Sequence, residues 1–197
     1  MLSRVKRIKK RSAYLLLLLL VFSTCVVIGA LYSRFFDLHL SLKGVSLHFS
    51  PVSDREMISY LKCFLFSFYD DAFDALYIFV AGFMLWGKAI VCSLLAIRGI
   101  RMGYYAIALA NAHLIDNSLF TPLEYFLFLL VELFLAFLII CLSREALFFN
   151  DRIKECYPKR FSIVKKPVFR GFAFDTVIIC GIIAVSKILY TFFIILL

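Results

Sequence analysis

Three charged residues lie inside strongly apolar stretches of the sequence and are the side chains most able to do chemistry there: Lys88, Glu132 and Lys187. An ionised carboxylate in the middle of a membrane span is costly, so Glu132 needs a partner, a proton or water. We therefore predict that Glu132 contacts Lys88 or Lys187 and that this pair holds a helix bundle together. The alternative is a transport or proton-relay role for the same residues, with Asp175 near the start of the last apolar run.

Motifs for other chemistry are absent from the sequence. It contains no G-x-S-x-G, no H-E-x-x-H and no phosphate-binding loop, and its six cysteines include no C-x-x-C pair. The three histidines do not lie near any pair of cysteines. We expect a protein that is not an enzyme and has no catalytic residue, cofactor or metal. An intramembrane enzyme is the third possible class.

The composition identifies the environment in which these charges must be positioned. Of the 197 residues 63% are hydrophobic and 18% are charged, with a mean hydropathy of +0.95. Soluble domains contain roughly 45–50% apolar and 25% charged residues. The composition excludes a disordered chain, a secreted disulfide scaffold and an ordinary water-soluble enzyme. It predicts a single domain of the all-α class, a polytopic integral membrane bundle of helices.

Five apolar stretches are predicted to cross the membrane, because a transmembrane helix needs about 20 mostly apolar residues. They are residues 13–31, 75–97, 102–120, 122–142 and 172–197. The third is the weakest, since its apolar part is too short to cross unless polar residues at its end are included. A re-entrant segment is the alternative for 102–120.

The distribution of lysine and arginine predicts the orientation of these spans. The tail 1–12 has six cations and no acid, and the loop 144–170 has eight cations against three acids. Cytoplasmic segments are enriched in cations. Five spans would place sixteen cations inside and four outside, with the N-terminus cytoplasmic and the C-terminus extracytoplasmic. Without interleaved aromatic residues, the basic segments are expected to contact lipid headgroups and not nucleic acid.

The predicted outer loop, 33–74, contains a candidate surface for a partner. Ser53 and Glu56 match a capping box, which predicts an interfacial helix over 54–69. Aspartates follow the helix immediately before the second span. The alternative for them is a solvated turn that carries no partner. The candidate partner surface consists of Tyr60, Phe64, Asp70 and Asp71.

Gly99 and Gly103 are spaced as a G-x-x-x-G pair between the second and third predicted spans. Glycines at this spacing allow two helix backbones to approach closely, which predicts a helix-packing role. The alternative is that both glycines belong to a turn between the spans.

The arrangement resembles the stage II sporulation protein M family of endospore-forming bacteria. The resemblance rests on the basic N-terminus with one anchor, an external segment, the helix Met57-Ile58-Ser59-Tyr60-Leu61-Lys62-Cys63-Phe64, a glycine-bearing span and the turn Arg98-Gly99-Ile100-Arg101-Met102-Gly103. Near the end of the second span this chain has Gly87-Lys88-Ala89 in place of the Gly-Pro pattern expected there.

The resemblance implies a non-enzymatic membrane scaffold for peptidoglycan remodelling during engulfment. Its implied partners are two cell-wall hydrolases, of the stage II sporulation protein D and P type, and it implies no catalytic residue. The competing hypothesis is a small membrane transporter or transporter subunit that uses the intramembrane charges. A neighbouring gene for a nucleotide-binding ATPase would favour transport, and expression confined to spore formation would favour the scaffold.

Overall fold

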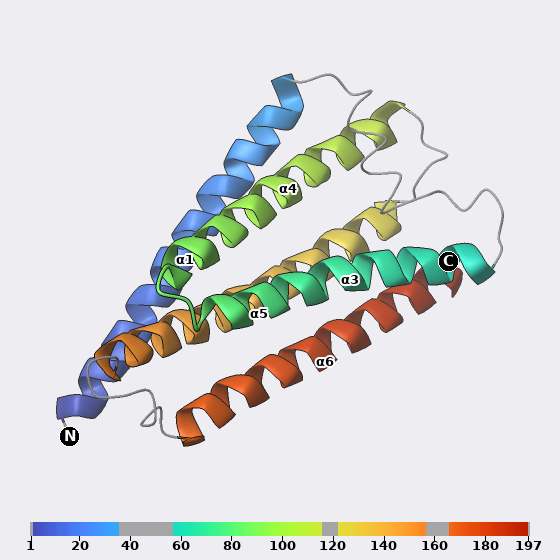
Figure 1. Cartoon of the computed structure of the whole chain (residues 1–197). Coiled ribbons are helices and arrows are strands. Elements are labelled where there is room, and N and C mark those ends of the chain that lie inside the picture. Colours follow the sequence, from blue (N-terminus) through green and yellow to red (C-terminus); the bar gives the residue numbers. More distant parts are fainter. Residues whose placement is uncertain (1, 36–56, 116–121, 157–165, 197) are drawn as a thin grey trace.

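The computed structural model describes residues 2–35, 57–115, 122–156 and 166–196. The second of these ranges includes a turn at 82–86. The described residues form five helices and contain no strand, which confirms the prediction of an all-α membrane bundle. The helices are α1 (Leu2–Phe35), α3 (Met57–Ala81), α4 (Gly87–Ile115), α5 (Pro122–Cys156) and α6 (Lys166–Leu196), shown in Figure 1.

Successive helices run in alternating directions, so that the two ends of the chain lie at opposite ends of the bundle (Figure 1). At one end the turn after α3 meets the last part of α5, since the side chain of Asn150 donates to the carbonyl oxygens of Gly82 and Met84. The start of α6 is at the same end, where the rings of Phe83 and Phe169 lie 5.8 Å apart. We call this the N-terminal end of the bundle.

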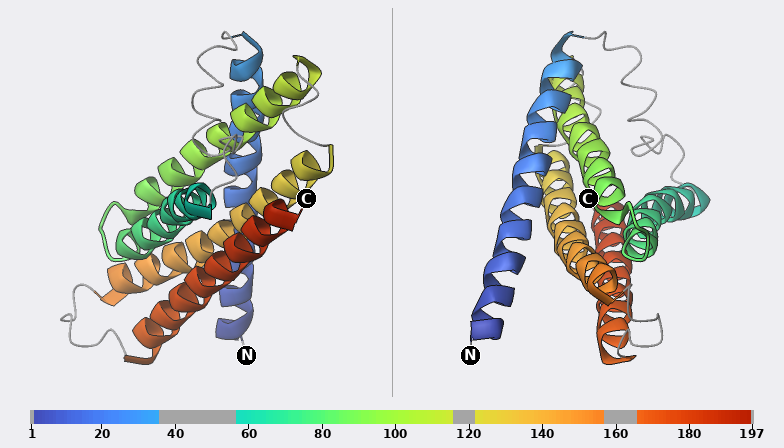
Figure 2. Two further views of the ribbon diagram at one scale, coloured as in Figure 1. Left: turned by 90° about the vertical axis from the view of Figure 1, so that its right-hand side faces the viewer. Right: turned by 60° about the vertical axis from the view of Figure 1, so that its left-hand side comes forward.

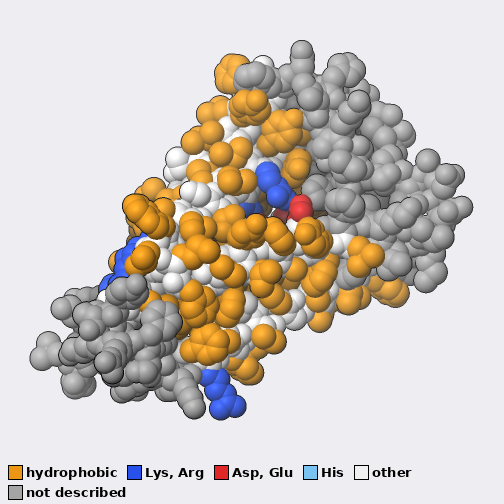
Figure 3. All heavy atoms as spheres, viewed as in Figure 1, with side chains coloured by type: hydrophobic (Ala, Val, Ile, Leu, Met, Phe, Trp, Pro, Cys, Tyr) orange, Lys and Arg blue, Asp and Glu red, His pale blue; other side chains and the backbone are white. Residues whose placement is uncertain are grey.

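Four of the described helices are long and apolar enough to cross a membrane, which identifies a multi-pass membrane protein. The candidate spans are Lys10–Phe35, Gly87–Ala108, Tyr125–Lys154 and Phe169–Phe193. Large apolar side chains face outward from these helices, and they cover most of the described surface in Figure 3. An apolar outer surface of this extent is suited to lipid and not to water.

The boundaries predicted for the second and third spans are wrong. The predicted span 75–97 is not one helix, because α3 ends at Ala81 and the chain turns through 82–86 before α4 begins. The predicted turn at 98–101 lies in the middle of α4, which continues without a break through the start of the predicted span 102–120. Hydropathy does not mark the real turn, because the residues of that turn are themselves apolar.

Local geometry explains why the chain turns after Ala81. The amide of Gly82 donates to the carbonyl of Ile78, and the amide of Gly87 donates to that of Met84. A methyl group at Gly87 would lie only 1.9 Å from the carbonyl oxygen of Ala81, so only glycine fits there. The side chain of Asn150 satisfies two carbonyl groups of the turn, which the helices cannot satisfy themselves.

Two other predicted boundaries also differ. The interfacial helix 54–69 does not end at 69, because α3 continues through the aspartates to Ala81; residues 54–56 lie outside the described part. The basic segment 144–170 is not a loop throughout, since α5 extends to Cys156 and α6 already begins at Lys166. In both cases polar residues lie inside a helix and do not mark its end.

Helices α1 and α4 are in backbone contact and run side by side (Figure 2). A methyl group at Gly103 would lie 1.9 Å from the carbonyl oxygen of Val26, and one at Gly29 would lie 2.1 Å from that of Ile100. At Gly99 the nearest atoms, in α1, would be 2.9 Å away. Gly99 and Gly103 therefore both face α1 from within a continuous helix, and they do not form a turn.

The hydrophobic core lies between α3, α4, α5 and α6, and Leu18 of α1 is also buried in it. Its fully buried members include Ile78, Leu95, Ile139 and Ile183. A group of phenylalanine rings closes the N-terminal end of this core, with centroids of neighbouring rings 4.9–5.2 Å apart: Phe79, Phe83, Phe149 and Phe172. This packing fixes the relative positions of the four helices that carry the buried charges described next.

Candidate functional site

Seven charged side chains from four helices form one cluster inside the bundle, in which five are joined by shared ion pairs and Asp70 and Arg101 form an adjoining pair. We call it the central network. Its members are Asp70, Asp71 and Asp74 of α3, Arg98 and Arg101 of α4, Glu132 of α5 and Lys187 of α6.

Arg98 lies at the centre of this network and is 7% exposed. Its Nη2 lies 2.5 Å from Oδ1 of Asp71, and its Nη1 lies 2.7 Å from Oδ2 of Asp74. Oε2 of Glu132 is 3.7 Å from the same Nη2. The planar guanidinium group offers several donors in fixed directions, which allows one cation to hold acids from two helices.

Lys187 connects α6 to the same acids and is 3% exposed. Its Nζ lies 2.7 Å from Oε1 of Glu132 and 3.0 Å from Oδ2 of Asp71. Each of these buried charges thus has an oppositely charged neighbour, as an apolar environment requires. Of the two cations considered for Glu132, the structure brings Lys187 to it.

The edge of the central network reaches the surface of the bundle. Nη2 of Arg101 lies 3.1 Å from Oδ2 of Asp70, and these side chains are 41% and 36% exposed. Figure 3 shows charged atoms interrupting the otherwise apolar face. Asp175, considered with the intramembrane charges, is exposed on α6 and does not belong to the central network.

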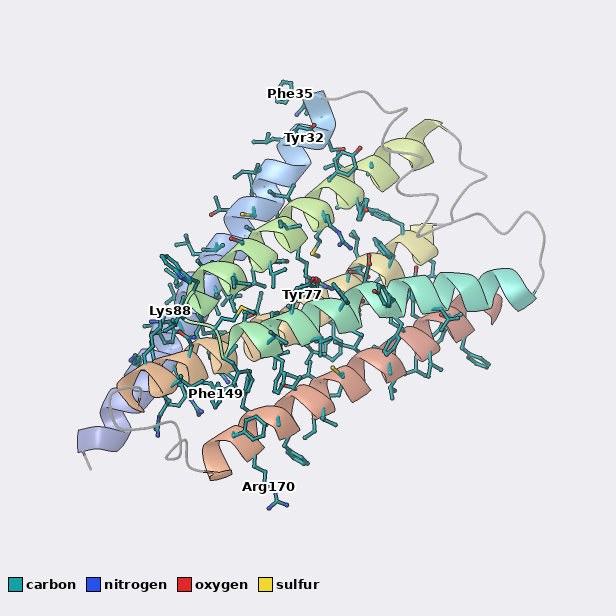
Figure 4. All side chains as sticks on the ribbon, viewed as in Figure 1. Tyr32, Phe35, Tyr77, Lys88, Phe149 and Arg170 are labelled. Atoms are coloured by element: carbon teal, nitrogen blue, oxygen red, sulfur yellow. The ribbon has the colours of Figure 1, made fainter. Side chains whose placement is uncertain are left out.

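Lys88 lies apart from Glu132, in a second cluster at the N-terminal end (Figure 4). Its Nζ lies 2.5 Å from Oδ1 of Asp151 on α5, and it donates to the hydroxyl of Tyr14 on α1 at 3.1 Å. The Tyr14 hydroxyl in turn donates to Asp151, which Lys10 also approaches at 2.7 Å. The expected alternative contact between Lys88 and Glu132 is therefore wrong, because the turn between α3 and α4 places Lys88 at the very start of α4.

The predicted partner surface is not a single exposed surface. Asp71 is 4% exposed and is held by Arg98 and Lys187, so it cannot meet a partner, and it does not belong to a solvated turn. Asp70 is half-buried beside Arg101. The side chains of Tyr60 and Phe64 lie outside the described residues. The prediction is wrong for Asp71 because the helix does not end before it.

Asp74, Arg98 and Arg101 are the members of the site that were not predicted as site residues from the sequence. Cytoplasmic segments are usually enriched in cations, so the charge of Arg98 suggests that it lies in a cytoplasmic turn between two spans. A usable signal was nevertheless present, since residues three or four positions apart share a helix face. Asp70 and Asp74 are spaced in this way, and so are Arg98 and Arg101. When one helix has acids on one face and another helix has cations on one face, the two charged faces are expected to pack against each other.

Among the described residues, no group of three or more His, Cys, Asp or Glu side chains could hold a metal ion. No family model, curated protein or solved structure matches this chain. The fold and the central network therefore define its class, a multi-pass helical membrane protein with a buried ionic network that joins four helices.

Proposed function

We propose that this protein is a scaffold of the cell membrane that organises cell-wall hydrolases while peptidoglycan is remodelled in sporulation and engulfment. The observation that supports a scaffold most directly is the central network. Its buried charges bind one another across four helices, which stabilises one fixed arrangement of the bundle. The sporulation context comes from the resemblance in the basic anchor and the helix from Met57 to Phe64.

The proposed topology has five crossings, with the N-terminus in the cytoplasm and the C-terminus outside. In it α3 is the second crossing and α4 the third, because α3 and α4 form a hairpin. Three aspartates in α3 make it too polar to count as a span by composition, but in the bundle their charges face Arg98, Arg101 and Lys187. The N-terminal end carries an excess of cations, as expected for the cytoplasmic side.

The proposed partners are lipids around the bundle and extracytoplasmic hydrolases of the stage II sporulation protein D and P type. In the proposed topology the outer end comprises the start of α3, the end of α4 and the start of α5. A partner that docks there would meet a rigid support, since the central network joins these helices within the bundle.

A transporter is the second candidate function, and one observation favours it. The Arg101–Asp70 pair is partly exposed and adjoins the buried charges, so the central network has a polar connection to the surface. Networks of this kind mark ion and proton pathways in membrane proteins. Ion flux in vesicles that contain the purified protein would support this alternative against the scaffold.

Deletion of the gene in a spore-forming host tests the scaffold. We expect septal wall thinning to stall and engulfment to stop, with recovery when the wild-type gene is restored. A parallel strain restores a Glu132→Gln variant, whose folded yield in membranes should fall if Glu132 is structural. Normal engulfment in the deletion strain would contradict the proposed function. An unchanged yield of Glu132→Gln together with altered ion flux would favour the transporter.

A further inference from the structure

The central network contains more acids than cations. Its seven members are four carboxyl groups and three basic groups. The imbalance remains when the partly exposed Arg101–Asp70 pair is set aside. In that case Arg98 and Lys187 face three acids, so one negative charge is in excess by either count. The inequality is a property of the described network and does not depend on the proposed function.

An excess charge in this place is expensive. Arg98, Glu132 and Lys187 all lie within candidate spans, and the innermost members are buried. A charge that is taken out of water without a partner is strongly destabilising. A carboxyl group in this position avoids the cost by taking up a proton, which leaves it able to accept and donate hydrogen bonds.

We propose that the central network is a proton-binding site and that its proton is held on Asp74. The network then has three ionised acids for its three cations and is neutral as a whole. The proton is bound from water and released to water, and no other reactant is needed.

The ion pairs identify Asp74 as the acid whose negative charge is least compensated. Asp71 is held by both Arg98, at 2.5 Å, and Lys187, at 3.0 Å. Glu132 is 2.7 Å from Lys187 and also has Arg98 within 3.7 Å. The one ion pair of Asp74 within the described part of the chain is with Arg98, which it shares with both other acids.

The charged groups around Asp74 come from its own helix and from the three helices packed with it. They are Asp70 and Asp71 on α3, Arg98 and Arg101 on α4, Glu132 on α5 and Lys187 on α6. Arg101 already balances the charge of Asp70, so it does not supply a second full charge for Asp74. A protonated Asp74 still accepts the hydrogen bond from Nη1 of Arg98 on its carbonyl oxygen.

Proton binding makes the stability of the bundle depend on pH with a definite sign. The folded protein holds one proton on Asp74, whereas an unfolded aspartate at neutral pH holds none. Stability therefore falls as the pH rises from about 4, where an unfolded aspartate ionises, until Asp74 itself loses its proton. An asparagine at this position imitates the protonated acid and should remove this part of the pH dependence.

Two measurements on the full chain in lipid vesicles test the proposal. Infrared spectroscopy at neutral pH should show the carbonyl band of a protonated carboxyl group in the wild type. The band should be lost in Asp74→Asn and retained in the control Asp175→Asn, which changes an exposed acid of α6 outside the central network and leaves the network's charge count unchanged. In thermal unfolding, Asp74→Asn should melt no lower than the wild type at neutral pH and should lose less stability as the pH is raised. The comparison variant Asp71→Asn should melt lower, because it removes a charge that two cations need.

Several results would overturn the proposal. One is the absence of a protonated carboxyl band in the wild type, and another is a band that persists in Asp74→Asn. In the third, Asp74→Asn is destabilised as strongly as Asp71→Asn, which would mean that Asp74 is an ionised partner of Arg98. None of these results depends on whether the protein organises cell-wall hydrolases, so failure here and failure of the proposed function are distinguishable.

Discussion

Loss of the Lys187 charge should weaken the bundle strongly. This side chain is buried, and its amino group lies within 3.0 Å of both Asp71 and Glu132. Methionine has a similar shape but no charge, so Lys187→Met leaves two acids inside the bundle with less compensation. We expect the free energy of unfolding to fall by about 3–5 kcal/mol. Reversible unfolding in mixed micelles, followed by circular dichroism, measures the change.

Arg170 provides the matched control for this substitution on the same helix. Its side chain is exposed and points away from the bundle (Figure 4). Arg170→Met should change the free energy of unfolding by less than about 0.5 kcal/mol, as is usual for surface positions. Equal effects of the two substitutions would contradict a stabilising role for Lys187.

For single residues, the free-energy cost of a charge in an apolar environment predicts that the charge needs a partner. It does not identify which residue that partner is. An acid in the middle of an apolar run has to be compensated, so Glu132 is recognisable from the sequence. Lys88 and Lys187 are equally suitable by charge. The choice between them depends on where α4 begins, because a start at Gly87 puts Lys88 at the N-terminal end of the bundle. That start is determined by contacts with residues far away in the sequence.

Among the helices, the contact between α1 and α4 should be the most sensitive to added volume. A methyl group at Gly103 would lie 1.9 Å from the carbonyl oxygen of Val26, which is backbone and cannot rotate away. Gly103→Ala therefore has to separate the two helices, and overpacking of this kind costs about 1–3 kcal/mol. Thermal unfolding in lipid vesicles should show a lower melting temperature than that of the wild type.

Gly181 on α6 is the control for the same chemical change. A methyl group there would meet nothing within 4 Å, so Gly181→Ala should leave stability unchanged or raise it by up to about 1 kcal/mol through helix propensity. If Gly103→Ala is tolerated as well as Gly181→Ala, the close approach of α1 and α4 is not required for folding.

The helices themselves are predictable from this sequence, but their ends are much less so. Hydropathy identifies the apolar helices because lipid and core both favour apolar side chains. It does not distinguish an apolar turn from a continuing helix, so the turn at 82–86 is indistinguishable from part of a span. The group that satisfies this turn is Asn150, which is remote in sequence. Conversely, the charges of Arg98 and Arg101 suggest a turn in the sequence. Only the structure shows that acids of α3 pair with them inside the bundle.

When the bundle is considered as a whole, the hairpin of α3 and α4 leads to a prediction about accessibility. Trp86 lies in the turn and is 79% exposed, and Phe35 at the end of α1 is 80% exposed. In the proposed topology the first is cytoplasmic and the second is extracytoplasmic. In a variant without the native cysteines, a membrane-impermeant maleimide should label Phe35→Cys in intact cells, whereas Trp86→Cys should react only after the cells are opened.

The same experiment separates the hairpin from the boundaries that hydropathy predicts. If residues 75–97 formed one span, position 86 would lie in the middle of the membrane and would be protected on both sides. Labelling of Trp86→Cys in intact cells would instead place the turn outside and reverse the proposed orientation. Labelling only from the cytoplasm requires α3 to cross, because α1 leaves the chain outside. Its three aspartates then have to lie within the membrane, where Arg98, Arg101 and Lys187 are their ion-pair partners.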